Sequence, residues 1–391
     1  MSETAAEQLK GTSLWQDAWK RLLKNRLAVL GMVVLGIMIL LVTFGPPILN
    51  WLTGITPDYI PADKELLKSF PPSREHLMGT DEQGRDIFAR VLQGGRISIA
   101  VGLIATVVSL VVGVSYGAIA GYLGGSTDNL MMRIVDIIYA IPYILIVIVL
   151  LSVFGGPNTQ VLVGALPAIL IALAVGIAGI LIAVNLYRRF YGEGVAVDFA
   201  DGLKRLAVGT VLFAAVAAAV AGTAYAVAQT GFGSSIGEAY GNAVGLGLSQ
   251  IFLLFFAVGL VSWLTMARVV RGQVLSLRNE EFVTAAKASG VSTLGIIFRH
   301  LVPNALGPVI VYSTLTVPSV MLSEAFLSYL GLGVQPPYAS WGSLAADGIK
   351  NIAIFPWQLI FPGVTMALTL FSLNFVGDGL RDALDPQTRK F

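Results

Sequence analysis

Apolar segments long enough to cross a bilayer recur along the whole sequence. A spanning helix needs about 20 predominantly apolar residues, and charged residues make up only 12% of this chain, against about 25% in a soluble domain. The sequence therefore predicts an all-α integral membrane protein with about eight spanning helices. The expected spans are residues 27–50, 97–121, 131–154, 162–187, 206–229, 250–270, 304–330 and 357–380.

The distribution of Lys and Arg predicts how these spans are oriented. With the N-terminus inside, 18 of the 25 Lys and Arg residues fall on the cytoplasmic side. Such an excess is typical of cytoplasmic connections. We therefore expect both termini, and the connection at 279–303, to lie in the cytoplasm.

Residues 1–26 are polar and do not resemble a signal peptide. Trp15, Ala18, Trp19 and Leu22 recur at helical spacing among four basic residues, which is typical of a short amphipathic helix on the inner leaflet. A plain basic flank before the first span explains the same residues equally well.

Several chemistries lack their sequence signatures. The chain contains no GxxxxGK[ST] and no HExxH, and it has no cysteine and only two histidines. We therefore expect no catalytic residue, no metal site and no cofactor in this chain, so active pumping needs a partner that converts energy.

The connection at 279–303 is charged and lies between two very apolar segments. Its first half favours a short helix on which Phe282, Ala285, Ala286 and Ser289 share one face, an aromatic residue beside three small ones. The pattern alone leaves two interpretations open, an ordinary cytoplasmic loop or a docking helix.

Glycine and proline mark the ends of this short helix and its connection. We expect Gly290 to end the helix and Pro303 to begin the next span. The spacing of Ala285, Ala286, Gly290 and Pro303 resembles the "EAA" loop of permease subunits of binding-protein-dependent ABC importers. Two positions depart from that loop, since Thr284 stands where the family has Glu and His300 where it has Ile.

The resemblance implies that this loop is the coupling helix that docks into a groove on a cytoplasmic ATPase. The departure at Thr284 puts a contact specific to Glu in question, but not docking through Phe282. The residues implied in ATPase coupling are Glu281, Phe282, Thr284, Ala285, Ala286, Lys287, Ser289, Gly290 and Pro303.

Three longer motifs narrow the resemblance to one group of importers. They are GTDEQGRD at 79–86, followed by GGRIS, then LGLGVQPP at 330–337 and GDGLRDALDP at 377–386. Together they resemble the C-type permease subunit of the dipeptide, oligopeptide and nickel importers. That resemblance implies a type I transmembrane domain, with 51–96 as an extracytoplasmic loop and the permease core at 97–385.

The family further implies partners and a cycle. The partners would be a second permease, two ATPases that bind ATP and Mg²⁺, and an extracytoplasmic binding protein, all at the bacterial inner membrane. Peptides would cross by alternating access, although close relatives handle nickel chelates, opines or oligosaccharides. An ion-coupled secondary transporter remains the rival interpretation.

Residues 158–249 do not share the resemblance. They contain two apolar runs around a basic linker, so we expect an inserted hairpin of two spanning helices. Because the hairpin crosses the membrane twice, it preserves the topology of a six-helix core.

Other candidate residues lie at the ends of spans or inside them. We expect Arg133 to pair with Asp136 near the inner surface. We also expect Ile87, Phe88, Val91 and Leu92 to share one face of an amphipathic helix on the outer surface. Trp341 and Tyr338 are expected to anchor at the interface. Arg268, Arg271 and Asp378 complete the candidate charges on the cytoplasmic side.

Glu324 is the most isolated acidic residue within the apolar spans. A carboxylate in the bilayer is costly unless it faces protein or water. It is therefore either a polar group of the translocation path, together with Tyr312 and Pro318 on the same span, or a hydrogen-bonded structural carboxylate near the outer boundary.

Overall fold

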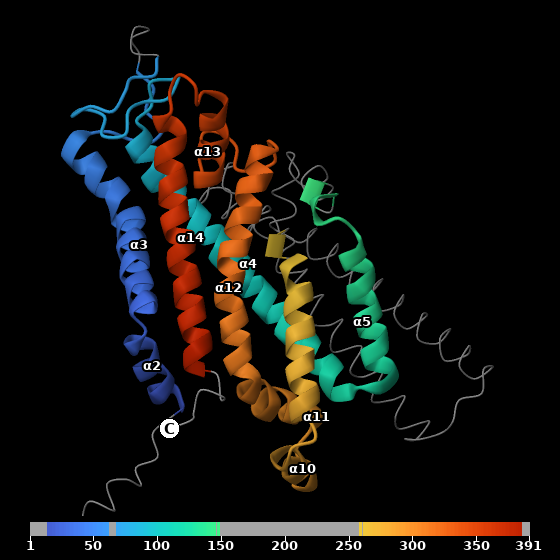
Figure 1. Cartoon of the computed structure of the whole chain (residues 1–391). Helices are drawn as coiled ribbons and strands as arrows, with labels where there is room; N and C mark the ends of the chain where they lie inside the picture. Colours follow the sequence, from blue (N-terminus) through green and yellow to red (C-terminus); the bar gives the residue numbers. More distant parts are fainter. Residues whose placement is uncertain (1–13, 62–67, 146, 149–257, 260, 385–391) are drawn as a thin grey trace, which may run out of the picture. The chain divides into compact units, whose positions relative to one another are not determined.

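The computed structural model describes residues 14–61, 68–145, 147–148, 258–259 and 261–384, which belong to one compact unit formed by 1–149 and 254–391. This part of the chain is helical (Figure 1). Its elements are α2 (Leu14–Lys24), α3 (Arg26–Thr53), α4 (Ile87–Leu123), α5 (Gly125–Ala140), helix 261–277, α10 (Glu281–Ala288), α11 (Thr293–Gly295), the π-helix η2 (Ile296–Leu301), α12 (Val302–Tyr329), α13 (Trp341–Lys350) and α14 (Trp357–Leu384).

Four helices in the described residues are long and apolar enough to cross a membrane. They are Arg26–Thr53, Ile87–Leu123, Thr293–Tyr329 and Trp357–Leu384. Each corresponds to an expected span, which confirms a helical membrane protein. The spans expected at 162–187 and 206–229, and with them the insert at 158–249, lie outside the described residues, so a total of eight stays a prediction.

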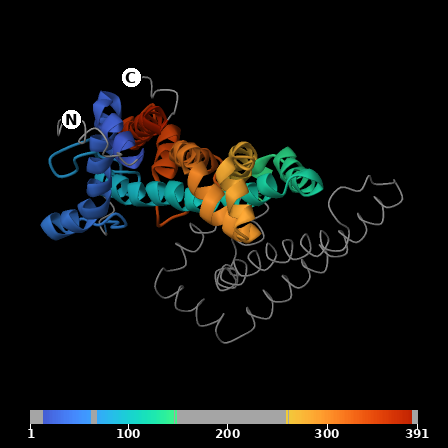
Figure 2. The same ribbon diagram turned by 90° about the horizontal axis from the view of Figure 1, so that it is seen from below.

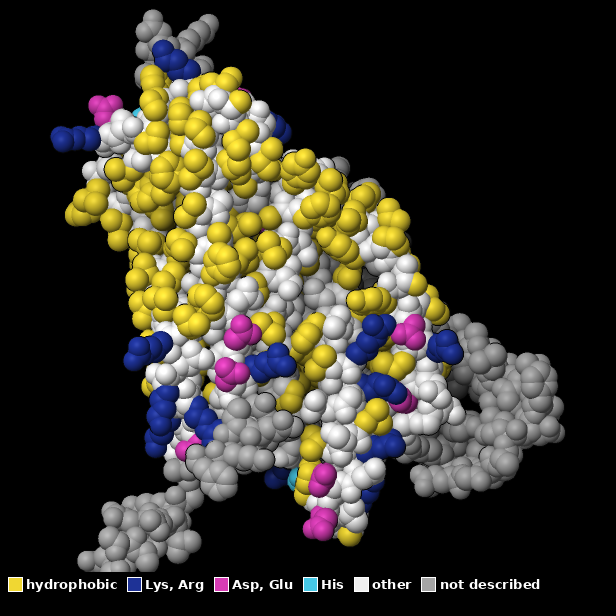
Figure 3. Space-filling model, in the orientation of Figure 1, with side chains coloured by type: hydrophobic (Ala, Val, Ile, Leu, Met, Phe, Trp, Pro, Cys, Tyr) yellow, Lys and Arg dark blue, Asp and Glu magenta, His cyan; other side chains and the backbone are white. Residues whose placement is uncertain are grey.

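Helix α4 crosses obliquely past α14 and α12, from the upper end of α3 to the start of α5 (Figures 1 and 2). Helices α2 and α10 lie at one end of this arrangement, which we call the α10 end. Helix α13 lies at the opposite end, which we call the α13 end. Charged side chains gather towards the α10 end of the face in Figure 3, below a broad hydrophobic surface.

Pro142 interrupts the third expected span. Helix α5 begins at Gly125, before the expected start at 131, and ends at Ala140. Ile141 is extended, with φ −80° and ψ 126°. A residue before proline is pushed to this region by the proline ring.

The helix expected at the end of the 51–96 segment is present, but it is the start of a longer helix and not a surface helix. Residues from Ile87 onward are the first turns of the continuous 37-residue helix α4, which Asp86 caps by accepting a hydrogen bond of 2.8 Å from the Ala89 N–H. Ile87, Val91 and Leu92 are buried. The loop expected to reach residue 96 therefore ends at Asp86. The side chains that follow pack into the core and not onto a membrane surface.

Trp341 is at the centre of that core, so its expected role as an interface anchor is also wrong. Its side chain is 0% exposed, and its indole Nε1–H donates a hydrogen bond of 2.8 Å to the carbonyl of Val91. Gly95 lets the ring approach, since a Cβ there would lie 2.6 Å from it. A buried indole usually finds such a partner.

Replacing Trp341 with phenylalanine is expected to lower the free energy of unfolding by about 1–2 kcal/mol, because a ring remains but its hydrogen bond to the Val91 carbonyl is lost. The thermal midpoint of the purified protein in detergent measures this. Trp51→Phe is the matched control, since Trp51 is 83% exposed and should change stability by less than about 0.5 kcal/mol. An equal midpoint for the two variants would contradict the role of the hydrogen bond.

The N-terminal segment does form a helix, α2, as one of the two sequence interpretations predicts. Its residues Ala18 and Leu22 are buried and cluster with Ala28 of α3 and Ala383 of α14. Trp19, by contrast, is 56% exposed. Part of the predicted lipid-facing face is thus covered by protein, and contact with the inner leaflet stays a prediction.

Arg96 donates hydrogen bonds to two carbonyls of α3 that have no N–H donor within that helix. Pro46 and Pro47 lie inside that helix and have no N–H to donate to the carbonyls four residues earlier. Those carbonyls belong to Val42 and Thr43. The Arg96 guanidinium, on α4, donates to both, with Nε 2.6 Å from the Val42 oxygen and Nη2 2.5 Å from the Thr43 oxygen.

Candidate coupling site

The loop at 279–303 folds as the short helix α10, from Glu281 to Ala288, at the α10 end of the molecule. Its C-terminus closes with two hydrogen bonds, Gly290 N–H to Lys287 carbonyl at 3.0 Å and Val291 N–H to Ala286 carbonyl at 3.1 Å. Gly290 has φ +75°. These features make a Schellman motif, which confirms that Gly290 ends the helix.

The exposed face of α10 differs from the expected one. Val283 is 0% and Ala286 7% exposed, and both point into the protein. Phe282, Ala285 and Ser289 face outward. At 100° per residue, Ala286 lies between Phe282 and Val283, so the burial of Val283 draws Ala286 inward. The predicted exposed face is therefore wrong for Ala286, which is buried.

The remaining coupling candidates on α10 are exposed. Glu281, Thr284 and Lys287 all reach the surface, and the Lys287 ammonium lies 5.4 Å from the ring centre of Tyr122, at the end of α4. The Arg278 guanidinium, just before α10, donates a long hydrogen bond of 3.4 Å to the Gly121 carbonyl. Contacts to the end of α4 thus flank the helix.

A π-helix joins the 279–303 loop to the next membrane helix. The Val302 N–H bonds to the carbonyl of Ile297, five residues earlier, and Pro303 follows without an N–H. Helical structure therefore starts at Thr293, ahead of the predicted start at Pro303, although α12 itself begins at Val302. A continuous helix thus runs from Thr293 through η2 into α12, and residues 289–292 form a short turn between it and α10.

Two ion pairs join helix 261–277 to α5 near the coupling loop. The Arg271 guanidinium forms two hydrogen bonds, of 2.5 and 2.6 Å, with the Asp128 carboxylate. Asp136 accepts a hydrogen bond of 2.9 Å from Arg268. The expected pair of Arg133 with Asp136 is therefore wrong, because a helix distant in the sequence supplies a cation at hydrogen-bonding distance.

Replacing Asp128 with asparagine is expected to lower the free energy of unfolding by about 1–3 kcal/mol. Its side chain is only 8% exposed, and the change removes a charged, bidentate partner of Arg271. Thermal unfolding in detergent measures the loss.

Two further variants of the same kind sharpen this test. Asp347→Asn removes an exposed pair with Lys350, in which both side chains are more than 60% exposed, and should have almost no effect. The exchanged pair Asp128→Arg with Arg271→Asp should recover part of the loss. If Asp128→Asn and Asp347→Asn are equally stable, the Asp128–Arg271 ion pair does not stabilise the fold.

The three candidates for the translocation path lie in different surroundings. Tyr312 lines a hollow of about 260 Å³ between helix 261–277 and α12. Pro318 is buried in α12.

We name the cavity that Tyr312 lines the hydroxyl hollow. Six hydroxyl-bearing residues line it, namely Ser262, Thr265, Tyr312, Thr316, Ser319 and Ser323.

Glu324 lies away from the hydroxyl hollow, enclosed between α12 and α13. It is 1% exposed, and its Oε1 accepts hydrogen bonds from the hydroxyls of Ser328, at 2.7 Å, and Ser340, at 2.6 Å. Gly342 leaves room for its Oε2, which a Cβ would approach to 2.9 Å. This geometry favours the structural alternative over a group of the path.

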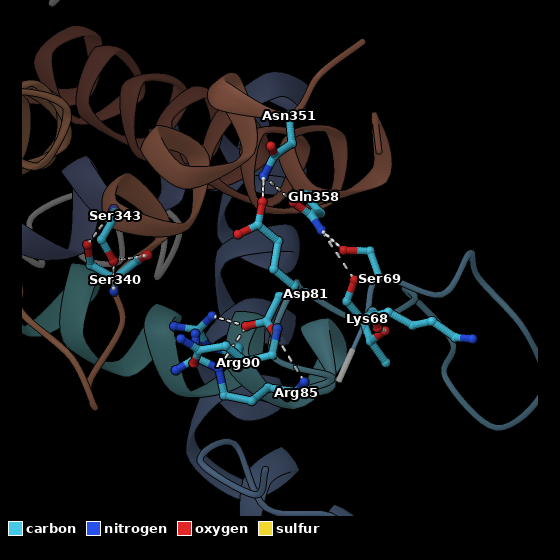
Figure 4. A network of polar contacts seen from close by, with 12 residues as sticks. Lys68, Ser69, Asp81, Arg85, Arg90, Ser340, Ser343, Asn351 and Gln358 are labelled. Atoms are coloured by element: carbon cyan, nitrogen blue, oxygen red, sulfur yellow. Dashed lines mark hydrogen bonds and ion pairs between the residues drawn. The ribbon is translucent and has the colours of Figure 1, made fainter. Parts of the chain in front are cut away.

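The GTDEQGRD segment is fixed at the α13 end by a network of polar contacts (Figure 4). Asp81 accepts hydrogen bonds from Arg85, at 2.7 Å, and from Arg90, at 2.6 Å. The amide of Asn351 donates to the carboxylate of Glu82 at 2.7 Å. The motif thus holds the start of α4 and the end of α13 together.

Comparisons with known proteins agree with these motifs. Residues 113–390 match the family described as binding-protein-dependent transport system inner membrane component, and residues 13–65 match the N-terminal transmembrane domain of oligopeptide transport permease C. The chain belongs to the first of these families. It is therefore a membrane component of a transport system and not itself the ATPase, as the sequence resemblance predicts.

Curated relatives of this family extend over nearly the whole chain. The oligopeptide transport system permease protein OppC of Haemophilus influenzae is 36% identical over 98% of this chain and 91% of its own length. OppC of Escherichia coli strain K12 is 37% identical over 98% and 94%. The dipeptide transport system permease protein DppC of Bacillus subtilis is 35% identical over 98% and 90%.

Family membership and the apolar helices indicate a multi-pass protein of the inner membrane. The family match at 113–390 includes the 279–303 loop and helix 261–277.

Sequence reasoning singled out Arg271 but missed Asp128 as its partner. The signal was available, since Asp128 is an acidic residue in a short turn expected on the same side of the membrane as Arg271, but many acidic residues share that side. The exposed Asp378 lies near the α10 end of α14.

Proposed function

We propose that this chain is the permease subunit of an ATP-driven importer that carries peptides across the bacterial inner membrane. The observation that supports this most is α10, a closed short helix with the aromatic Phe282 on its exposed face. Peptides are the proposed substrate because the curated relatives are oligopeptide and dipeptide permeases.

The proposed partners are a second permease, two ATPases and an extracytoplasmic binding protein. The α10 end would face the cytoplasm, where α10 docks on an ATPase that binds ATP and Mg²⁺. The α13 end, with its fixed polar network, would face the binding protein. The Lys and Arg side chains at the α10 end of the face in Figure 3 support this orientation.

The mechanism we propose is alternating access driven through α10. Val283 and Ala286 pack α10 onto the protein, so the helix moves with its surroundings as a rigid element. The path through η2 would pass that movement to α12, which lines the hydroxyl hollow. Closure of the ATPase dimer would open the permease pair outward, and hydrolysis would reset it.

Purification of the complex from native membranes in mild detergent tests this proposal. We expect a second permease and two P-loop ATPases to accompany the chain, and the complex in liposomes to import peptide only with ATP inside and binding protein outside. Recovery of the chain alone, with ion-driven transport, would replace the proposal with the secondary transporter. ATP-driven import of nickel chelates, opines or oligosaccharides instead of peptides would correct only the substrate.

A further inference from the structure

The hydroxyl hollow presents mainly hydrogen-bond acceptors. The hydroxyls of Ser262, Thr316, Ser319 and Ser323 donate their protons to carbonyls of their own helices, at 2.9, 2.8, 3.1 and 2.9 Å. A hydroxyl whose proton is engaged in this way keeps its oxygen lone pairs as acceptors. A ligand that contacts these oxygens therefore has to supply N–H or O–H donors.

The hollow is also electrically neutral. None of the described residues that line it carries a charge. In surroundings of low dielectric constant, a fixed charge would strongly hold or repel a charged ligand side chain. A neutral lining avoids both, so it suits ligands that share a backbone but differ in side-chain charge.

The polar residues of α12 form a continuous stripe. Tyr312, Thr316, Ser319 and Ser323 follow one another at spacings of four, three and four residues, which places them on one face of the helix. At a rise of 1.5 Å per residue the stripe is about 16 Å long. An extended chain covers about 3.3 Å per residue, so the stripe matches about five residues of an extended peptide.

We propose that the hydroxyl hollow is a stretch of the transport path that accepts hydrogen bonds from the main-chain N–H groups of an extended peptide, without distinguishing its side chains. The inference rests on the proposed function and adds the chemistry of recognition to it. Passage without tight binding follows, because each contact is a single neutral hydrogen bond.

Thiol labelling tests whether the hollow is on the path. The chain has no cysteine, so Ser319→Cys creates its only thiol. The probe is membrane-impermeant trimethylammonium methanethiosulfonate, applied to the complete transporter in liposomes during ATP turnover. Leu322→Cys is the control, since Leu322 is 53% exposed on the same helix but does not line the hollow.

We expect Ser319→Cys to react at least about tenfold faster than Leu322→Cys, because a thiol needs water to ionise, and saturating peptide should slow this reaction. Equal rates at the two positions, or a rate at Ser319→Cys that peptide leaves unchanged, would overturn the inference.

A charge placed in the hollow tests its neutrality. Ser319→Asp should change the ratio of Ala-Lys-Ala to Ala-Glu-Ala uptake by about tenfold or more, whereas the neutral control Ser319→Asn should leave the ratio unchanged.

The outcomes separate the inference from the proposed function. If the unaltered complex imports peptide and Ser319→Asp leaves the uptake ratio unchanged, the hollow is not a peptide contact and the proposed function stands. If the unaltered complex imports no peptide, the proposed function is wrong and the inference fails with it.

Discussion

Replacing Phe282 with alanine is expected to reduce peptide uptake by about 100-fold or more while leaving the chain folded in the membrane. Phe282 is 36% exposed on the outward face of α10, so truncating it opens no core cavity. Aromatic anchors of an interface commonly contribute at least about 2 kcal/mol, and about 3 kcal/mol corresponds to a 100-fold loss. The loss should come from failed docking on the ATPase.

Uptake of labelled peptide into liposomes, measured beside thermal stability and ATPase recovery, checks this expectation. Phe371→Ala is the matched control, because it deletes the same ring from a side chain that is 60% exposed on a different helix, α14. It should transport normally. Unchanged uptake by a folded Phe282→Ala protein would count against the assignment of α10 as the coupling helix.

Gly290→Pro addresses the same helix through its backbone. Gly290 has φ +75° and donates its N–H to Lys287, and proline permits neither. The two variants should therefore fail for different reasons, Phe282→Ala by losing a contact and Gly290→Pro by losing the shape of α10.

Local features of the sequence predicted much of this fold. Runs of apolar residues located the spans at Arg26–Thr53 and Trp357–Leu384, because helix length is set by the bilayer. Gly290 marked the end of α10, because the backbone conformation that favours glycine acts within a few residues. The sequence motifs likewise located α10.

Contacts between distant segments were not predictable in the same way. Asp136 has Arg133 nearby in the sequence, yet it pairs with Arg268, which is 132 residues away. Trp341 has the residue type and position of an interface anchor, but side chains of α3, α4 and α12 pack around it. The Asp136 pair and the burial of Trp341 both depend on how the helices pack. An amphipathic pattern predicts which face of a helix is buried, but not which element packs against it.

Replacing Arg96 with glutamine is expected to lower the free energy of unfolding by about 2–4 kcal/mol. The change removes two charged hydrogen bonds from the carbonyls of Val42 and Thr43, which Pro46 and Pro47 leave without helical donors. Val42 is a buried residue, and a buried carbonyl without a donor costs about as much free energy as a lost hydrogen bond.

A double-mutant cycle separates this explanation from a simple loss of charge. Alanine at both Pro46 and Pro47 restores the two N–H donors within α3, so Arg96→Gln in that background should cost less than about 1 kcal/mol. Thermal unfolding of the four proteins in the same detergent gives the coupling energy. If Arg96→Gln costs the same with and without the prolines, Arg96 acts through another contact, and the prolines are tolerated for a different reason. The expected coupling would show that a proline pair in one membrane helix and an arginine in the next form a single structural unit.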